Sequence, residues 1–208
     1  MTNLFSYFLF LTLVNFNVVF ADNIKVAVEK QMPLAGGKST NKNYLQTAWT
    51  SVDQLSISYF LGENKGIYFG LNYSKEFTNH SQRSSDTRPD GDFTSNFVSI
   101  GPEVGFWVQP ADRFRIEMGL FLGAGDFKFS GSDSPLTETQ YARKVDFHMG
   151  AIYSSAILGA DLPIDFIAKY GIYKVFLNEF TYNNITYTRS ELDLKFYLYF
   201  CLGVGLRF

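Results

Sequence analysis

The last 17 residues of the chain alternate strictly between two kinds of side chain. Every even-numbered residue from Leu192 to Phe208 is large and apolar, whereas the odd-numbered ones are charged residues, tyrosine, cysteine or glycine. A helix would scatter these apolar residues around its circumference. A strand buried on both faces would not tolerate three charges and two glycines on one of them. The pattern therefore predicts a strand with two chemically opposite faces.

Seven further segments show the same period of two, and two of them are irregular. Pro102 lies within the fourth segment, where its missing N–H predicts a bulge. In the seventh, Lys174 falls on the otherwise apolar even positions, and Val175 and Leu177 continue the apolar series on odd ones. This slip predicts a one-residue bulge near Tyr173. The segments cover residues 24–31, 45–61, 67–74, 98–109, 114–125, 145–154 and 166–177.

The connections between these segments alternate between long and short. Antiparallel barrels of outer membranes have short periplasmic turns and longer extracellular loops, and an even strand number returns the chain to its starting side. The sequence therefore predicts an all-β fold, an eight-stranded antiparallel up-and-down transmembrane β-barrel. The expected long loops are residues 33–44, 78–92, 131–143 and 181–190, and the expected short turns are residues 62–66, 110–113 and 161–165.

Alternation alone leaves open which face meets lipid, because a soluble lipocalin-like barrel also alternates, with its apolar face inside. The polar face of this chain is rich in glycine and carries only isolated charges, which suits a narrow filled lumen better than a solvated exterior. The apolar face carries Leu, Phe, Val, Ile and Met, with Tyr toward the strand ends, as a lipid-facing band should. We therefore expect the apolar face to point outward.

The first 21 residues are expected to be a secretory signal peptide that is removed, leaving residues 22–208 as the barrel domain. Leu4 to Phe20 is mostly apolar, and Val19-Phe20-Ala21 places small residues at the two positions that a signal peptidase recognises. A retained membrane anchor is the alternative. Against it, the segment is short and is interrupted by Asn15 and Asn17.

Composition excludes several classes of function. The formal net charge is −2 and no basic stripe is present, so nucleic acid is not an expected partner. Cys201 is the single cysteine, which excludes an intramolecular disulfide framework. Gly36-Gly37-Lys38-Ser39-Thr40 lacks the earlier glycine of a phosphate-binding loop, and no carboxylate and histidine cluster has metal-ligand spacing. No cofactor and no metal ion is expected.

The chain resembles the small eight-stranded outer-membrane proteins of the OmpA N-terminal domain and OmpX/Ail type. The likeness rests on the strand architecture and on the closing strand, in which Phe208 is last and Phe200, Val204 and Leu206 hold alternating apolar positions before it. The resemblance implies a bacterial outer-membrane location, contact with outer-membrane lipid and lipopolysaccharide, and an ending that the barrel-assembly machinery reads. It further implies that the four long loops bind host surface molecules, with roles in adhesion and resistance to host defence.

Eight charged or titratable side chains are predicted to face the lumen. Because unpaired charge in such an interior is costly, we expect acids and bases to pair there as a polar plug. A narrow pore gated by a rearranging ion pair, or a channel for apolar solutes, is an alternative. The predicted residues are Glu103, Arg115, Glu117, Asp146, His148, Asp193, Lys195 and Arg207.

A lipid A-modifying enzyme is the second alternative, since deacylases and palmitoyltransferases also occur as eight-stranded barrels. A deacylase would need a serine and a histidine close together on the lipid-facing surface. His80 falls in a predicted loop, His148 is assigned to the lumen, and Ser154 and Ser155 lie too far along the strand from it. We therefore expect a non-enzymatic protein with a structural or surface-interaction role through its loops.

Overall fold

The computed structural model describes residues 23–35, 45–82, 91–131, 139–156, 163–177, 180–182, 185–187 and 196–208. The predicted signal segment and two of the predicted lumen residues, Asp193 and Lys195, lie outside them. Among the described residues, no helix is long and apolar enough to cross a membrane.

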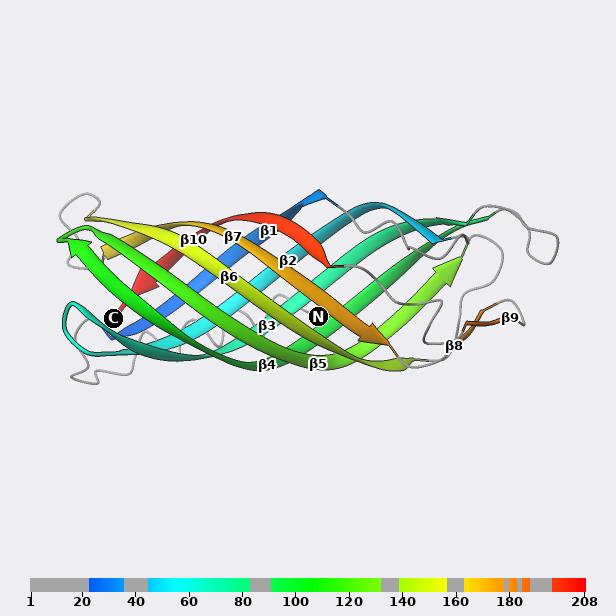
Figure 1. The fold of residues 1–208 in the computed structure, drawn as a ribbon, viewed down its shortest axis with the longest axis horizontal. Helices are drawn as coiled ribbons and strands as arrows, with labels where there is room; N and C mark the ends of the chain where they lie inside the picture. The colour runs from blue at the N-terminus through cyan, green and yellow to red at the C-terminus, as the bar shows by residue number, and fades with distance from the viewer. Residues whose placement is uncertain are drawn as a thin grey trace, which may run out of the picture.

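Eight strands form one closed antiparallel barrel with strongly tilted strands (Figure 1), which confirms the predicted fold. Around the barrel the order is β1-β10-β7-β6-β5-β4-β3-β2, so each strand pairs with its neighbour in the chain and the last long strand pairs with the first. A separate small hairpin is formed by β8 and β9. The strands are β1 (Ile24–Ala35), β2 (Leu45–Leu61), β3 (Lys65–Gln82), β4 (Gly91–Ala111), β5 (Phe114–Gly131), β6 (Gln140–Ala156), β7 (Pro163–Leu177), β8 (Phe180–Tyr182), β9 (Ile185–Tyr187) and β10 (Tyr197–Arg207).

Several strands extend further toward the long loops than the alternation predicts. Strand β3 takes up residues 78–82 and β4 residues 91–92 of the predicted loop 78–92, and β8, which begins at Phe180, and β9 take up parts of the predicted loop 181–190. The alternation fades in these parts because polar side chains appear on the outward face as well. Backbone ladder hydrogen bonds do not depend on side-chain polarity, so the strands continue.

Neither predicted bulge is present. The pairing of β3 with β4 passes through Pro102 opposite Leu71 without a shift, and the register between β4 and β5 is the same on both sides of it. In β7 the register also runs unbroken past Tyr173 against β6, and it is unbroken up to Tyr173 against β10. Both bulge predictions were therefore wrong. The register shifts that do occur fall between Pro33 and Ala35, Thr47 and Trp49, and Val108 and Ala111.

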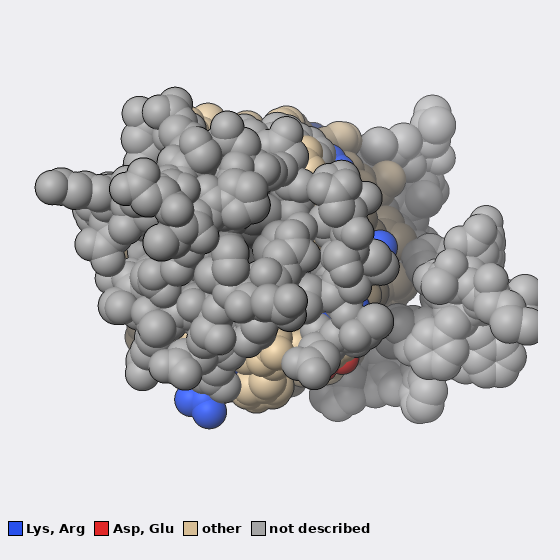
Figure 2. Space-filling view, turned by 90° about the vertical axis from the view of Figure 1, so that its right-hand side faces the viewer, with Lys and Arg blue, Asp and Glu red and all other residues tan. Residues whose placement is uncertain are grey.

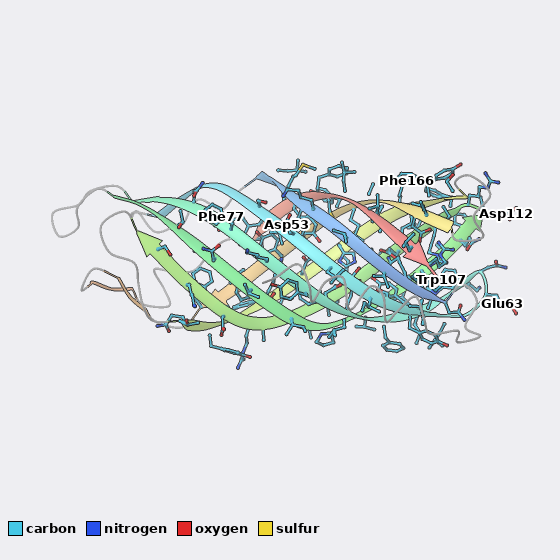
Figure 3. The ribbon with its side chains drawn as sticks, turned by 180° about the vertical axis from the view of Figure 1, so that it is seen from behind. Asp53, Glu63, Phe77, Trp107, Asp112 and Phe166 are labelled. Atoms are coloured by element: carbon cyan, nitrogen blue, oxygen red, sulfur yellow. The ribbon has the colours of Figure 1, made fainter. Side chains whose placement is uncertain are left out.

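The two faces of the wall differ as predicted for a membrane barrel. Large apolar side chains project outward around it (Figure 3), among them Phe106 at 68% exposure and Val204 at 52%. The inward positions hold buried polar and charged residues together with aromatic rings. This is the reverse of a lipocalin-like barrel, in which the apolar face points inward.

The barrel closes at the end that carries the short turns. There Ile24 and Phe208 exchange backbone hydrogen bonds of 3.1 and 2.8 Å, which joins the first strand to the last. The turn after β2 depends on Gly62, whose φ is 101° and where an added Cβ would lie 2.2 Å from the Lys65 carbonyl oxygen. This turn therefore requires glycine.

Candidate functional site

The candidate site is the buried polar interior of the barrel. All six predicted lumen residues that the structure describes face inward and are at most 9% exposed, namely Glu103, Arg115, Glu117, Asp146, His148 and Arg207. The prediction omitted further buried charged residues on the same face. The alternation along each strand already places these residues on the polar face. They are Lys25, Glu29, Glu76, Lys144, Asp165 and Lys169.

A charged cluster and an aromatic one fill the lumen near the short turns. Arg207 Nη2 donates to both carboxylate oxygens of Asp165, at 2.9 and 3.0 Å, and to Ser154 Oγ at 2.8 Å. The Arg115 guanidinium lies 4.4 Å from the ring centroid of Phe60 and 4.5 Å from that of Trp107. Cation–π contact of this kind accommodates a buried guanidinium among rings.

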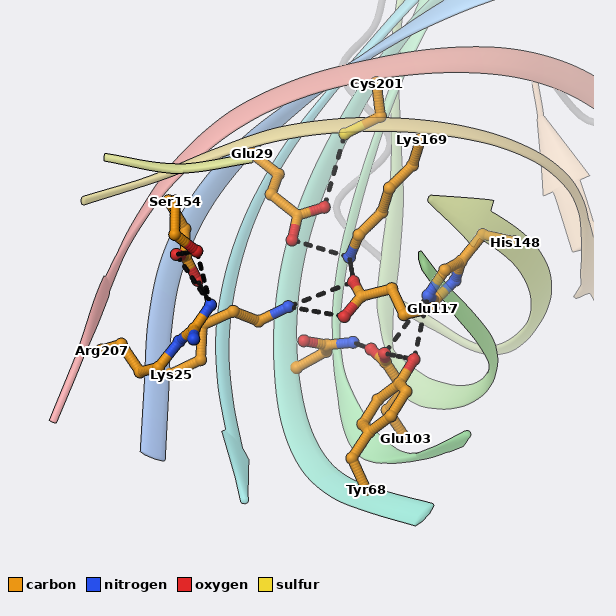
Figure 4. Close-up of polar contacts among 12 residues, drawn as sticks. Lys25, Glu29, Tyr68, Glu103, Glu117, His148, Ser154, Lys169, Cys201 and Arg207 are labelled. Atoms are coloured by element: carbon orange, nitrogen blue, oxygen red, sulfur yellow. Dashed lines mark hydrogen bonds and ion pairs between the residues drawn. The ribbon is translucent and has the colours of Figure 1, made fainter. Parts of the chain in front are cut away.

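Four charged residues form a chain across the middle of the lumen (Figure 4). Lys25 Nζ donates to both oxygens of Glu117, at 3.1 and 3.0 Å. Lys169 Nζ lies 3.3 Å from Glu117 Oε1 and donates to Glu29 Oε1 at 2.8 Å. Cys201 Sγ donates to the other oxygen of Glu29 at 3.4 Å. Lys169 is therefore shared between two carboxylates.

His148 lies between two acidic groups beside this chain. Its Nε2 is 3.3 Å from Glu103 Oε1 and 3.3 Å from the Tyr68 hydroxyl, and its Nδ1 is 3.8 Å from Asp146 Oδ1. The Tyr68 hydroxyl donates to Glu103 Oε1 at 2.7 Å, and the Asn72 side-chain amide donates to Glu103 Oε2. These contacts fix His148 inside the lumen, away from lipid (Figure 4).

Asp146 connects this group to the next layer toward the loops. The Tyr199 hydroxyl donates to Asp146 Oδ1 at 2.7 Å, and Gln31 Nε2 donates to Asp146 Oδ2 at 3.4 Å. Lys144 Nζ is 3.8 Å from Asp146 Oδ2 and 4.1 Å from the centroid of the Tyr173 ring. Each charge in this layer thus faces an opposite charge, a hydrogen-bond donor or an aromatic ring.

Glycine on the lumen face makes room for tyrosine rings. At Gly119 an added Cβ would lie 2.1 Å from the Tyr68 hydroxyl, and at Gly171 it would lie 2.5 Å from the Tyr199 ring. The rings pass close to the backbone at these positions, where any side chain would displace them. These two glycines therefore leave room for the tyrosine rings that fill the lumen.

The buried charges nearly balance within the described residues. Six carboxylates face five Lys or Arg residues, with His148 as an additional base. No group of three or more His, Cys, Asp or Glu residues in the described chain could hold a metal ion. Most of these charges contact an opposite charge, and Arg115 lies among the aromatic rings described above. The carboxylates belong to Glu29, Glu76, Glu103, Glu117, Asp146 and Asp165, and the cations to Lys25, Arg115, Lys144, Lys169 and Arg207.

The outer face of the wall changes near the loop end. There the outward positions of β5, β6 and β7 carry Asp126, Lys128, Arg143 and Lys174. Inside, Phe97 and Phe127 pack at 5.9 Å between centroids, and Tyr173 stacks on Tyr197 at 5.0 Å, while the polar side chains of Glu76, Thr78, Ser95 and Lys144 are buried at the same end. Val175 and Leu177 are buried further along β7, while Lys174, directly before Val175, faces outward. We call this part of the barrel, with polar outward positions and a mixed aromatic and polar interior, the collar. The collar explains why the apolar series of β7 moves from even to odd positions at Lys174. The medium outside the barrel changes there, whereas the register of the strand does not.

Below the collar, an apolar belt surrounds a paired polar lumen, which is the arrangement of a barrel immersed in lipid. The protein is an integral β-barrel of the bacterial outer membrane. No family model matches the sequence, and no curated protein matches it. The fold is similar to several solved outer-membrane barrels.

Three of these similar structures cover nearly the whole chain. OprG from Pseudomonas aeruginosa has 12% identity and a TM-score of 0.50, with 90% of this chain and 96% of that one covered. Ail from Yersinia pestis has 15% identity and a TM-score of 0.41, covering 91% and 100%. The N-terminal barrel domain of Pseudomonas aeruginosa OprF has 16% identity and a TM-score of 0.43, covering 90% and 98%. At these identities the likeness concerns the fold alone.

Proposed function

We propose that the protein is a non-enzymatic outer-membrane anchor that holds its loop-bearing end clear of the membrane for contact with surface molecules of a host. The observation that carries this proposal is the collar. A barrel that served only to span the bilayer would end its strands at the headgroups. Here β4 and β5 continue as paired strands whose outward positions, such as Asn96 and Lys128, are polar and whose inward positions include the packed rings of Phe97 and Phe127.

The filled lumen supports the same proposal. Ion pairs such as Lys25–Glu117 and Arg207–Asp165 cross-link strands that are far apart in the sequence. Buried pairs of this kind are costly to break, so they stiffen the cylinder. A stiff cylinder with a collar holds the connecting segments at a fixed height above the lipid surface.

The experiment is a whole-cell binding assay on bacteria that display the protein. One variant replaces residues 83–90 and 132–138 with short Gly-Ser turns and leaves the strands unchanged. We expect wild-type cells to bind a host-cell monolayer and the loop-replaced cells to lose that binding. Heat-modifiable gel migration checks that both proteins are folded. Equal binding by the two strains would contradict the proposal.

One contact favours a narrow gated conductance as a second candidate. Lys169 contacts Glu29 and Glu117 at the same time, so it has two alternative carboxylate partners. Exchange between them would rearrange the middle of the plug. Single-channel recording in planar bilayers tests this, with Glu117→Gln expected to change the open time. A silent bilayer for both proteins would exclude the conductance.

The lipid A-modifying alternative receives no support from the placement of His148. A lipid-directed active site needs its histidine on the outer surface, whereas His148 is 2% exposed and is surrounded by Glu103, Asp146 and Tyr68. The side chain of His80 lies outside the described part. Lipid A mass spectrometry of cells with and without the protein provides the direct check.

The barrel-assembly machinery remains a proposed partner through the end of β10. Val204 points outward at 52% exposure, and Phe200, Leu206 and Phe208 lie on the same face. Backbone pairing of Phe208 with Ile24 places this apolar edge at the closing seam of the barrel. A receptor that recognises this ending would bind the free edge of β10 before β1 pairs with it.

A further inference from the structure

The outward-facing charges on β5, β6 and β7 mark where the barrel wall leaves the hydrocarbon. On β6 the outer face is apolar up to Val145 and then carries Arg143, and on β7 it is apolar up to Ile172 and then carries Lys174. The change from apolar to charged outward residues at the same level on two paired strands places Arg143 and Lys174 at the height of the outer-leaflet headgroups.

Arg143 and Lys174 are neighbours on the sheet surface. Arg143 lies opposite Phe176, and Lys174 lies opposite Val145, so the two cations hold diagonal positions on adjacent strands. Diagonal side chains of this length can reach one common ligand. We call these two residues the β6–β7 cation pair.

Exposed aromatic rings surround the cation pair. The Arg143 guanidinium is 5.9 Å from the Tyr141 centroid, and Lys174 Nζ is 5.3 and 5.5 Å from the centroids of Phe176 and Phe196. The rings are 53%, 40% and 59% exposed. Aromatic residues at this depth are typical of the membrane interface, where one edge meets acyl chains and the other meets headgroups.

The outer face of β5, β6 and β7 is more positive than the opposite wall. On that wall Lys30 Nζ contacts Asp53 Oδ1 at 2.8 Å, and Lys75 lies opposite the same Asp53, so two bases face one acid. On the described parts of β5, β6 and β7, the outward charges are three bases and one acid. Seen from the loop end, Lys and Arg atoms emerge at separate places around the rim (Figure 2). The bases are Lys128, Arg143 and Lys174, and the acid is Asp126.

We propose that the β6–β7 cation pair binds the phosphate groups of a phosphorylated glycolipid in the outer leaflet. The guanidinium of Arg143 offers a planar fork that matches a phosphate, and the ammonium of Lys174 adds a second charge. The acyl chains of the same lipid begin at Val145 and Ile172, the last apolar outward positions before the cations, and the rings of Tyr141, Phe176 and Phe196 lie beside the headgroup. The site rests on the outer-membrane location and is independent of the proposed loop contacts.

The test measures lipid A bound to the purified protein by native mass spectrometry from detergent micelles. Wild-type protein is compared with Arg143→Gln/Lys174→Gln, and lipid A carrying phosphates is compared with dephosphorylated lipid A. We expect the double variant to lose about thirtyfold in affinity for phosphorylated lipid A, because the electrostatic attraction of each interfacial cation contributes about fivefold. Dephosphorylated lipid A should bind wild type as weakly as phosphorylated lipid A binds the variant.

The matched control is Arg113→Gln/Lys65→Gln, which removes one Arg and one Lys from the exposed rim at the short-turn end. It should bind like wild type. Heat-modifiable migration verifies folding, and Arg143→Gln alone replaces the double variant if that fails to fold. Unchanged binding by the variant would overturn the proposal. Equal binding of dephosphorylated lipid, or displacement by millimolar inorganic phosphate, would overturn it as well. The assay contains no host molecule, so its failure leaves the loop proposal untouched.

Discussion

On β5 the membrane-embedded part of the wall and the collar have opposite polarity. In β5, Leu120 faces lipid and Glu117 faces the lumen, whereas further along the same strand Lys128 faces outward and Phe127 is buried. The alternation of two faces is constant, and only the medium outside changes. Which face of β5 is apolar therefore depends on height along the barrel, so one strand can present an apolar face to lipid and a polar face to water.

The largest effect should come from removing a shared charge in the embedded part. Glu117→Ala leaves Lys25 and Lys169 without a common carboxylate in the buried lumen, and we expect a loss of ~3–5 kcal/mol in the free energy of unfolding. Denaturant titration in lipid vesicles, followed by gel migration, measures this. Asp53→Asn breaks an exposed ion pair with Lys30 and should cost at most ~1 kcal/mol. Similar losses in both variants would mean that the lumen charges are not coupled.

The next largest effect concerns the cost of placing an arginine on the outer face at two heights. Leu120→Arg places a charge in the apolar belt, which should cost ~2–4 kcal/mol. Asn96→Arg places the same side chain on the outer face of the collar, where the cost should be ~0–1 kcal/mol. The same unfolding titration compares them. Equal costs would show that the belt extends beyond Asn96 and that the collar lies in lipid.

A smaller loss of stability is expected from changes to the apolar residues inside the collar. Val175→Thr keeps the shape of the side chain but buries a hydroxyl beneath the loop end, which should cost ~1–3 kcal/mol. Phe176→Tyr, the adjacent residue on the outer face, should be nearly neutral because its hydroxyl can reach water or headgroups. If Val175→Thr were neutral in thermal unfolding, the interior of the collar would have to be hydrated.

The smallest effect on stability is expected at the closing seam. Phe208→Ala removes one half-exposed ring and should change the free energy of unfolding by less than ~1 kcal/mol once the barrel has formed. If the assembly machinery reads this ring, the amount of folded protein in the outer membrane should nevertheless fall severalfold. Quantitative blotting of heat-modified and unmodified bands distinguishes the two. Normal yield in cells would remove Phe208 from the proposed signal.

Alternation along single strands was enough to predict the eight strands, their antiparallel order and the inward placement of residues such as Glu117 and His148. It could not predict which lumen charges meet. Lys25 and Glu117 are 92 residues apart, and their contact depends on the register of every intervening strand and on the shear of the closed barrel. The bulge expected near Tyr173 failed for a different reason. Lys174 was judged by the polarity of the embedded wall although it lies in the collar.

The hydrogen bonds between Ile24 and Phe208 also constrain the order in which the barrel can form. Strand β1 has β10 as one of its two neighbours, and β10 is the last strand to emerge during synthesis. Until it arrives, β1 and the most recently added strand both expose unpaired backbone groups that lipid cannot satisfy. Insertion is therefore expected to be cooperative and late, with the complete chain held in a protected state beforehand. These two edges must therefore stay out of the hydrocarbon until the seam between β1 and β10 closes.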